Sequence, residues 1–545
     1  MKPPRSNRHE WLNLATAANL EVELFCEQSK NTVRSKIKHV DANHSQFIRH
    51  GIAWQATLSE ALNAMINWAR SLQEAKKLPE LEFTITRLAV SELLSQIHFG
   101  IAMSQDEIFR PHHIGLEEKA FQLSQNPNIK PLIDPLCSSQ HQFIVTECNR
   151  RQSIGNAGLD ESLQLIADQF RTFSQTEIQP FANDWHLENK LIPDQLIKKL
   201  SELGVFGLTI DEKYGGSGLG KLAMCVVTEE LSRGYIGTGS LGTRSEIAAE
   251  LIQLGGTQHQ REKYLPLIAD GSIFPAAVFT EPETGSDLGA IRTRAIRLPD
   301  DRWQLTGNKT WITHAARSDL MTVLARTDPK QPGYRGLTMF LVDKNRGTAD
   351  NDFPDAGLTG SEIDVLAYRG MKEYNLAFDQ FKVPPDATLG GIDGNGFKQL
   401  MTTFEAARIQ TAARAVGVAE NACELALAYA SQRQQFGQTL LGFERIYGKI
   451  ARMAADVMTA RQLTYRAARI KDRAIRCDID AGMAKLYAAR TAWYCADNAV
   501  QIHGGTGYAL SSPVSRLLND ARILSIFEGT AEIQADVIAR GLLND

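Results

Sequence analysis

The sequence predicts a mainly α-helical protein with a small β domain near its middle. Apolar residues recur at helical spacing in the first half of the chain and again in its last third. Between these regions, from about Phe274 to Pro385, short β-type runs are separated by Gly, Pro, Asp and Asn. The chain has 545 residues. Because a single hydrophobic core stops growing near roughly 250 to 300 residues, we expect several domains.

Composition and charge argue against several classes of protein. The chain is 43% hydrophobic and 22% charged, which is typical of a globular protein, and its net charge of −4 argues against a general affinity for nucleic acid or an anionic membrane. No run approaches the roughly 18 apolar residues of a membrane span, and the polar, basic stretch Met1–Glu10 lacks the apolar part of a signal peptide. We therefore expect a cytoplasmic protein whose partners include no nucleic acid and no membrane.

The cysteines predict free thiols rather than disulfides or a metal site. Their total is odd, they form no CxxC pair, and none has a histidine at metal-ligand spacing. The seven residues are Cys26, Cys137, Cys148, Cys225, Cys423, Cys477 and Cys495.

Residues 1–150 are expected to form a helical extension without a catalytic constellation. One predicted helix carries its apolar residues on a single face, at Leu58, Leu62, Met65, Ile66 and Ala69. The tryptophans at positions 11, 54 and 68 are more typical of core packing than of cofactor contacts. The stretch 126–158, with proline and glycine among polar residues, predicts a linker and a domain boundary.

We expect three further domains: a helical domain over residues 159–273, a middle β domain over 274–388 and a helical bundle over 389–545. Asp160 is placed to cap the first of these helices. The glycine-rich run 214–220 lacks GxGxxG spacing and predicts a surface turn. The alanine-rich helices after Gly396 are typical of a closely packed bundle.

A short stretch near the C-terminus, Ile526–Thr530, is a candidate site for general-base chemistry. Glu528 follows apolar residues and precedes Gly529, a setting that desolvates a carboxylate and raises its proton affinity. The glycine allows a ligand to approach the backbone, and Thr530 adds a hydroxyl. By itself this pattern is equally a helix-end or cap feature.

Several motifs, in order along the chain, resemble those of the acyl-CoA dehydrogenase family, flavoenzymes that oxidise the Cα–Cβ bond of acyl-CoA thioesters. The motifs are Phe279–Asp287 (TEP-x-x-GSD), Gly307–Thr313 (G-x-K-x-W-I-T), Arg433–Gly437 (R-x-x-FG), Gln501–Gly507 (Q-x-x-GG-x-G) and Phe527–Thr530 ([YF]EGT). The resemblance covers residue 159 to the end. It implies the acyl-CoA dehydrogenase fold, in which a small β-barrel-like domain lies between a helical domain and a C-terminal four-helix bundle.

The resemblance implies an FAD cofactor and assigns residues to it. The expected FAD-binding residues are Phe279, Thr280, Gly285, Ser286, Trp311, Ile312, Thr313, Arg433, Phe436, Gln501, Gly504, Gly505 and Thr530. In the family the arginine at position 433 reaches the flavin of a neighbouring subunit, which implies a homodimer or homotetramer. His503 is expected to be structural. The family normally passes its electrons to electron-transferring flavoprotein.

The resemblance also implies a mechanism, in which Glu528 removes the α-proton of the thioester and the β-hydrogen leaves as hydride to the flavin. Some family members carry the base one position before Arg408, where this chain has Ala407, so Glu528 is the candidate at a family position. Arg408, Ser286 and Gly529 are expected on the substrate side.

Arg244 and Ser245 bear on the acyl group. An arginine in an apolar, glycine-rich stretch requires an anion or exposure, and this pair resembles the residues by which glutaryl-CoA dehydrogenases hold a distal carboxylate. The alternative is that Arg244 pairs with Glu246 or Glu250 at the surface. Together with the helical extension over residues 1–150, the pair of Arg244 and Ser245 favours a short branched dicarboxylyl-CoA as the substrate. The unusual Glu283-Thr284 in the flavin loop is expected to reshape the pocket mouth.

Four other functions stay open. A glutaryl-CoA dehydrogenase would also release CO2, another short-chain acyl-CoA dehydrogenase would have no use for Arg244, and an acyl-CoA oxidase would react rapidly with O2. Some relatives are flavoproteins that bind DNA through a basic patch, against which the acidic net charge and the retained Glu528 argue.

Overall fold

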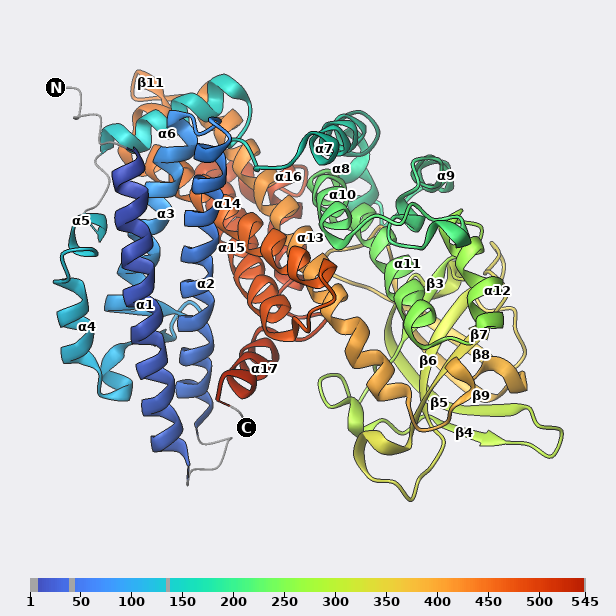
Figure 1. Ribbon diagram of the computed structural model, residues 1–545. Coiled ribbons are helices and arrows are strands. Elements are labelled where there is room, and N and C mark those ends of the chain that lie inside the picture. Colours follow the sequence, from blue (N-terminus) through green and yellow to red (C-terminus); the bar gives the residue numbers. More distant parts are fainter. Residues whose placement is uncertain (1–7, 39–44, 134–137, 544–545) are drawn as a thin grey trace. The chain divides into compact units, whose positions relative to one another are not determined.

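The computed structural model describes residues 8–38, 45–133 and 138–543 (Figure 1). The chain forms two compact units. Unit 1 combines Met1–Leu165 with Thr411–Asp545, and unit 2 is Ile166–Gln410. The described part is mainly helical with one large sheet, as the sequence predicts.

Unit 1 joins the N-terminal extension to the C-terminal helices. The elements of the extension are α1 (Arg8–Ile37), α2 (Gln46–Glu74), α3 (Glu80–Phe99), β1 (Ile101–Ala102), β2 (Ile108–Phe109), α4 (Glu117–Ser124), α5 (Lys130–Ile133) and α6 (Ser138–Arg151). The C-terminal elements are the later part of α13 (Gly396–Gln432), β10 (Gln434–Gln435), β11 (Gln438–Thr439), α14 (Glu444–Asp472), α15 (Asp478–His503), α16 (Pro513–Ile523) and α17 (Ala531–Leu543).

The extension packs directly on these C-terminal helices. Helices α2, α3 and α6 contact α14, and α2 also contacts α15 and α17 (Figure 1). The predicted apolar face of α2 is buried in this packing, as are Trp54 and Trp68. At the far end of α1, Arg34 donates a hydrogen bond of 2.7 Å from Nη2 to the carbonyl oxygen of Leu542. The extension and the C-terminal helices therefore share one core.

Part of the predicted linker is wrong, because residues 126–158 contain α5 and the fourteen-residue helix α6. Helix α6 buries Ile144, Val145 and Cys148, three apolar side chains in a sequence that is otherwise polar. Such a narrow apolar stripe can stabilise a helix when a neighbouring helix covers it. It gives only a weak periodic signal in the sequence. The short β1–β2 pair was also not predicted.

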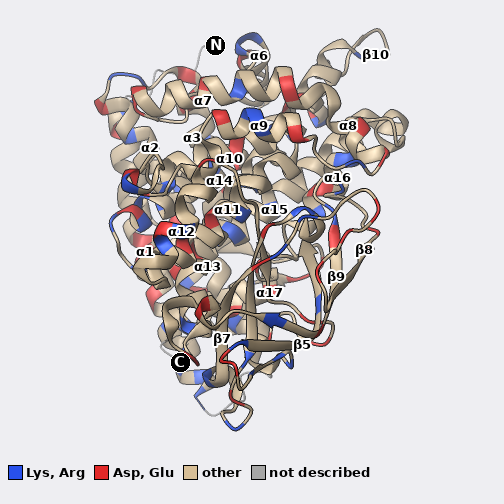
Figure 2. Ribbon diagram, turned by 90° about the vertical axis from the view of Figure 1, so that its right-hand side faces the viewer, with Lys and Arg blue, Asp and Glu red and all other residues tan. Residues whose placement is uncertain are grey.

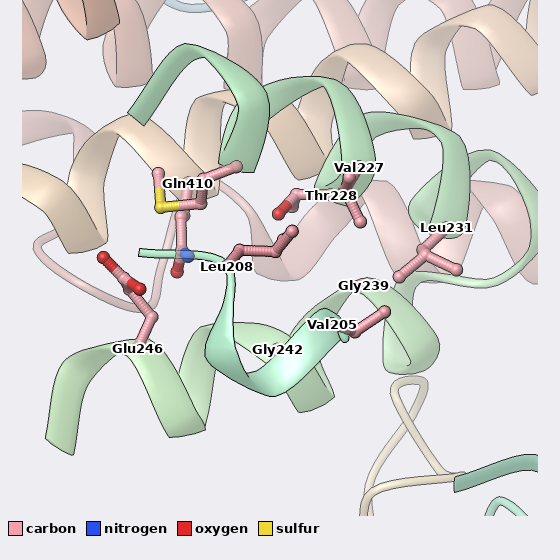
Figure 3. Close-up of a pocket in the computed structure, with 10 residues that line it drawn as sticks. Val205, Leu208, Val227, Thr228, Leu231, Gly239, Gly242, Glu246 and Gln410 are labelled. Carbon is pink, nitrogen blue, oxygen red and sulfur yellow. The ribbon is translucent and has the colours of Figure 1, made fainter. Parts of the chain in front are cut away.

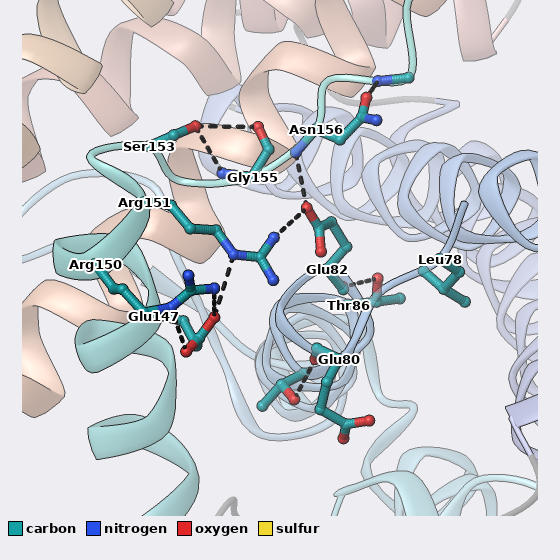
Figure 4. Close-up of polar contacts among 12 residues, drawn as sticks. Leu78, Glu80, Glu82, Thr86, Glu147, Arg150, Arg151, Ser153, Gly155 and Asn156 are labelled. Atoms are coloured by element: carbon teal, nitrogen blue, oxygen red, sulfur yellow. Dashed lines mark hydrogen bonds and ion pairs between the residues drawn. The ribbon is translucent and has the colours of Figure 1, made fainter.

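A buried carboxylate fastens α3 to α6 and to the segment that follows α6 (Figure 4). Glu82 Oε1 accepts a hydrogen bond of 3.0 Å from the backbone N–H of Asn156 and lies 3.3 Å from Nη1 of Arg151. Arg151 is held in turn by Glu147, at 3.2 Å. Glu82 is almost fully buried, so these partners offset the cost of removing its charge from water.

Unit 2 begins with helices. They are the later part of α7 (Glu161–Phe173), α8 (Gln179–Leu187), α9 (Asp194–Glu202), α10 (Lys221–Gly234), α11 (Ile236–Gly255) and α12 (Gln258–Ala269). The predicted cap on α7 is confirmed, since the backbone N–H of Leu163 donates a 2.9 Å hydrogen bond to Asp160 Oδ1. The glycine-rich run before α10 is a turn, with Gly215 and Gly218 at positive φ, and forms no dinucleotide loop.

The sheet of unit 2 has seven strands in the order β3-β6-β4-β5-β9-β8, with β7 paired to β6. The strands are β3 (Pro275–Val278), β4 (Arg294–Arg297), β5 (Trp303–Thr313), β6 (Leu320–Arg326), β7 (Leu337–Asp343), β8 (Leu358–Ile363) and β9 (Glu373–Val383). Short β-type runs predicted in this part of the sequence, at residues 303–306, 320–325 and 337–342, lie in β5, β6 and β7. Alternate residues of β6 and β7 enter two different cores, Leu320 and Leu324 beside helical residues and Met321 and Val323 beside other strands.

Within the described residues, no helix is long and apolar enough to cross a membrane. Figure 2 shows lysine and arginine residues interspersed with aspartate and glutamate residues along the helices and strands. The six described cysteines are buried and form no disulfide with one another, and Cys137 lies outside the described residues.

Candidate active site

Glu528 lies in the short segment between α16 and α17, in unit 1. Both Glu528 and Gly529 have positive φ, at 54° and 89°, so the chain turns sharply here. Thr411 Oγ1 donates a hydrogen bond of 2.5 Å to Glu528 Oε2, and Arg414 Nη2 lies 2.8 Å from Glu528 Oε1. Both partners come from α13. The Glu528 side chain remains 13% exposed, so a path to it stays open.

The surroundings of Glu528 correct the expectation that apolar neighbours dominate them. Leu524 is buried, but Ile526 is 45% exposed, and the carboxylate itself faces a hydroxyl and a guanidinium. The guanidinium of Arg414 is fully buried and lies 4.6 Å from the ring centroid of Phe527. The carboxylate is therefore held by specific polar contacts.

The backbone around Glu528 is also fixed. Gln534 Nε2 donates to the Glu528 carbonyl oxygen at 3.2 Å, and Lys485 Nζ donates to that of Gly529 at 2.5 Å. A Cβ on residue 529 would lie 2.0 Å from Gln534 Nε2, so the position requires glycine. Thr530 Oγ1 accepts a 3.3 Å hydrogen bond from the N–H of Ile533 and so caps α17. The interpretation of this motif as a helix cap is therefore correct for Thr530.

Sequence reasoning missed Thr411 and Arg414. They are three residues apart on α13, so their side chains lie on the same face of the helix. The available signal was a charged residue inside the alanine-rich stretch that the sequence assigns to a bundle core, where an arginine requires a partner.

In unit 2, two of the predicted flavin motifs are joined by a buried ion pair. Lys309 Nζ lies 3.1 Å from Glu281 Oε1 and donates hydrogen bonds of 2.8 Å to the carbonyl oxygens of Phe279 and Leu324. The N–H of Thr310 donates to the carbonyl oxygen of Thr280 at 3.0 Å. Burial lowers the pKa of the Lys309 ammonium to about 8 against the attraction of Glu281. The loop 279–287 and strand β5 are thus held together.

The Trp311-Ile312-Thr313 stretch ends β5 with a bulge. The register shifts between Lys309 and Ile312, and Trp311 has a φ of 59° and is 56% exposed, whereas Ile312 is buried. The bulge therefore presents the indole of Trp311 to a ligand or to solvent. Gly285 and Ser286 are exposed, but the side chain of Phe279 is buried in the core.

The remaining predicted cofactor residues lie in unit 1. Arg433 precedes the two-stranded hairpin β10–β11, and Phe436 at its tip is 92% exposed. Gln501, Gly504 and Gly505 lie at the end of α15, and a Cβ on either glycine would meet no atom within 4 Å. His503 stacks on Tyr429 with ring centroids 4.2 Å apart, in agreement with a structural role.

Arg244 and Ser245 are buried in α11, so the alternative that Arg244 lies at the surface is wrong. Glu246 and Glu250 both form ion pairs with Lys221, the latter at 3.1 Å. The charge of Arg244 acts on Glu373 and on His314. Burial lowers the pKa of His314 to about 3, so its imidazole is neutral at physiological pH.

Arg408 and Ala407 lie on α13 in unit 2. The guanidinium of Arg408 lies 5.9 Å from the ring centroid of Phe404 and is half-buried, and Ala407 is buried. Glu283 is exposed, while Thr284 is buried in a turn closed by its hydrogen bonds with Glu281.

A cavity of about 10 Å³ lies between α10, α11 and Gln410 (Figure 3). It holds at most one water molecule. Gly239, Gly242 and Glu246 line it from one face of α11, whereas Arg244 is two residues from Gly242 and Glu246 and so projects from another face. The cavity is therefore not the site to which Arg244 contributes. Among the residues that the structure describes, no cluster of His, Cys, Asp or Glu could hold a metal ion.

Comparisons with known proteins define the class of this protein. The acyl-CoA dehydrogenase N-terminal domain model matches residues 160–272, the middle domain model residues 276–381 and the C-terminal domain model residues 394–543. The chain belongs to the acyl-CoA dehydrogenase family, whose members use a flavin to oxidise acyl-CoA thioesters, and the predicted fold and family are confirmed.

One relative is similar over the whole chain. The (2S)-methylsuccinyl-CoA dehydrogenase of Cereibacter sphaeroides is 52% identical over 98% of this chain and 98% of its own length. That span includes the extension, so the similarity to this relative reaches beyond the three family domains.

Solved structures match a shorter part of the chain. A chain from the structure of the electron transferring flavoprotein of Acidaminococcus fermentans has a TM-score of 0.67 and 34% identity, covering 71% of this chain and 99% of that chain. A glutaryl-coenzyme A dehydrogenase bound to glutaryl-CoA has a TM-score of 0.67 and 32% identity, covering 71% of this chain and 96% of that chain.

Proposed function

We propose that this chain is an FAD-dependent dehydrogenase that oxidises (2S)-methylsuccinyl-CoA to mesaconyl-CoA, the step required by the ethylmalonyl-CoA pathway. The observation that carries this proposal is the 52% identity over 98% of the chain, extension included, to an enzyme of that name. The chain passes its electrons to electron-transferring flavoprotein, in keeping with the similar chain in a structure of such a flavoprotein.

The residues present suit a flavin. Thr284 Oγ1 is buried at the loop 279–287 without a hydrogen-bond partner among the described residues, so it can donate to a bound group. Trp311 has an exposed indole ring. Its strand, β5, is hydrogen-bonded to the loop 279–287. Gly504 and Gly505 leave open space beside the backbone, which suits phosphates. When bound, the flavin supplies the acceptor for the hydride that leaves Cβ.

Glu528 acts as the general base. The thioester carbonyl acidifies the α-carbon, and the carboxylate of Glu528 takes the α-proton. Thr411 and Arg414 hold its two oxygens, and the left-handed backbone at Glu528 and Gly529 aims the side chain. Backbone N–H groups of this turn can stabilise negative charge on the thioester carbonyl oxygen.

Arg244 holds the free carboxylate of the substrate. It is a buried guanidinium in α11, and Ser245 beside it is buried as well. A planar guanidinium matches the geometry of a carboxylate, and a low local dielectric strengthens the pairing. Arg408, half-buried on α13, serves the substrate side.

The exposed hairpin around Phe436 supports a homo-oligomer, as a dimer or a tetramer. A phenylalanine that is 92% exposed at the tip of a hairpin, beside Arg433, suits a contact with a second copy of the chain and with its flavin.

Anaerobic bleaching of the flavin absorbance tests the proposal. We expect methylsuccinyl-CoA to bleach the wild type, with glutaryl-CoA and butyryl-CoA far weaker. The Arg244→Ala variant should lose at least tenfold in apparent affinity for methylsuccinyl-CoA, and Arg244→Lys should recover part of it. Preferred bleaching by butyryl-CoA, with no effect of Arg244→Ala, would instead indicate an ordinary short-chain dehydrogenase. Bleaching by glutaryl-CoA with release of CO2 would indicate a glutaryl-CoA dehydrogenase.

A further inference from the structure

Glu373 is a buried carboxylate that the proposed mechanism does not use. It begins β9 and pairs in register with Thr313, the last residue of β5. Thr313 Oγ1 donates a hydrogen bond of 2.9 Å to Glu373 Oε1. The other oxygen, Oε2, is buried and has no hydrogen-bond partner among the described residues. Glu373 is 8% exposed. Its Oε2 atom is therefore a buried oxygen that can accept a hydrogen bond or bind a proton.

The charged groups around Glu373 come from several elements. From β8, Glu362 pairs with Lys372 at 2.6 Å, and from the turn after β5, Arg317 pairs with Asp194 at 3.0 Å. Beside them are Tyr374, whose pKa is raised by burial and by Asp352, and the neutral His314. Lys372 and Arg317 are thus each paired with a carboxylate other than Glu373.

Arg244 is the charge that acts on Glu373. It projects from α11 and is 8% exposed, as buried as Glu373 itself. Burial raises the pKa of Glu373 to about 7, with Arg244 and the Thr313 hydroxyl working in the opposite direction. In the absence of substrate, Glu373 near neutral pH is therefore divided between its charged and its protonated form.

A substrate carboxylate at Arg244 would add a second negative charge to this buried group. Two carboxylates near one guanidinium cannot both keep their charge cheaply, so one of them binds a proton. The substrate carboxylate would contact the guanidinium directly, whereas the free Oε2 of Glu373 has no donor to lose. The proton therefore belongs on Glu373.

We propose that Glu373 is a specificity-determining residue that takes up one proton from solvent when the free carboxylate of a dicarboxylyl-CoA binds at Arg244. The proton forms an O–H bond on Oε2, and no bond of the substrate changes. This inference rests on the proposed role of Arg244. It makes the binding of a dicarboxylyl thioester, but not of a monocarboxylyl one, dependent on pH.

Proton uptake on binding tests this inference in the FAD-loaded, full-length enzyme. Mesaconyl-CoA and crotonyl-CoA are suitable probes, because both are already unsaturated and neither reduces the flavin. Titration calorimetry at pH 8 in two buffers of different ionisation enthalpy gives the number of protons taken up. The wild type should take up most of one proton with mesaconyl-CoA and none with crotonyl-CoA, since a group with a pKa near 7 is mostly ionised at pH 8.

Two variants locate the proton. Glu373→Gln keeps an acceptor for Thr313 and should abolish the uptake and the roughly tenfold weakening of mesaconyl-CoA binding per pH unit above pH 7. Glu362→Gln, on the neighbouring strand, should leave both unchanged. If Glu373→Gln takes up the same number of protons as the wild type, or if the wild type takes up none, the inference is overturned.

The design separates this inference from the proposed function. If mesaconyl-CoA binds the wild type no better than crotonyl-CoA at pH 6, the role of Arg244 fails. If mesaconyl-CoA binds better but without proton uptake, the role of Arg244 stands and that of Glu373 is overturned. The wild-type measurement decides the matter even if a variant does not fold.

Discussion

Arg414 Nη2 lies 2.8 Å from Glu528 Oε1, and the guanidinium is fully buried while the carboxylate keeps a small exposed surface. The same guanidinium donates to Thr411 Oγ1 at 2.8 Å and faces the ring of Phe527. One α13 side chain therefore fixes the hydroxyl, the carboxylate and the aromatic residue of the candidate site. Arg414 is a positioning residue for Glu528.

Replacement of Arg414 by methionine should affect both stability and turnover. Removing one member of a buried ion pair costs about 3 kcal/mol of unfolding free energy, and Glu528 would lose its fixed position. We expect kcat for flavin reduction to fall by about tenfold or more with KM little changed, because the substrate contacts remain. Denaturant unfolding and stopped-flow reduction measure the two effects. Arg414→Lys should restore part of kcat; equal losses in both variants with an altered KM would contradict a positioning role.

Replacement of Glu528 by glutamine should leave the flavin bound but prevent its reduction by substrate. The amide keeps the shape of the side chain and its contacts with Thr411, but it cannot accept the α-proton. General-base catalysis contributes about 10²- to 10⁴-fold, so the rate of anaerobic bleaching should fall by that factor. Glu532→Gln, four residues later and exposed on α17, is the matched control and should react like the wild type. Full activity in Glu528→Gln would move the base to another residue.

Replacement of Lys309 by methionine should loosen the flavin loop. Glu281 would keep its hydrogen bonds from the N–H groups of Arg292 and Thr293, at 2.7 and 2.8 Å, but would lose the buried ammonium. We expect a loss of about 3 kcal/mol of stability and a lower flavin content, because the lysine also ties two backbone carbonyls together. Lys382, exposed on β9, provides the control as Lys382→Met. An unchanged flavin-to-protein ratio in Lys309→Met would show that the pair has no part in the cofactor site.

The sequence predicts those parts of the fold and site that depend on local pattern. Helical spacing predicts the buried face of α2, short β-type runs predict strands such as β6 and β7, and the Asp160 cap follows from its neighbours in the sequence. The motifs with Glu528 and Trp311 are continuous stretches, so their positions could also be named in advance.

What the sequence does not predict depends on contacts between distant residues. Arg414 and Glu528 are 114 positions apart, and Thr313 and Glu373 are 60 apart and meet through the register of β5 and β9, which includes bulges. Helix α6 was missed because its stability comes from packing on α14 rather than from its polar sequence. None of these partners can be found by spacing along the chain.

The stability of the fold should depend on pH through Glu373. Burial raises its pKa from 4.5 to about 7, so between these values the folded state binds more protons than the unfolded state. Stability contributed by the protonated form is complete below pH 4.5 and is lost as the pH rises through 7. At about 1.4 kcal/mol per pKa unit, the loss is about 3 kcal/mol. Glu373→Gln removes this dependence.

Thermal unfolding of the wild type and Glu373→Gln at pH 5 and pH 8 checks this expectation. The variant should gain about 2 to 3 kcal/mol relative to the wild type on going from pH 5 to pH 8. Glu362→Gln serves as the control, because Glu362 is partly exposed and paired with Lys372. A constant difference between the wild type and Glu373→Gln across this range would contradict the titration of Glu373.

Replacement of Glu82 by glutamine tests whether the extension is part of one cooperative core. Its carboxylate joins α3 to α6 and to the N–H of Asn156, and the amide would keep the latter acceptor but lose the charge facing Arg151. Because Arg151 retains Glu147 and is partly exposed, we expect a loss of about 2 kcal/mol rather than the full cost of a buried pair. The exposed Glu80→Gln variant is the matched control. Since α3 and α6 both pack on α14, a single unfolding transition should shift as a whole. An early, separate transition for Glu82→Gln would mean that the extension unfolds independently of the C-terminal helices.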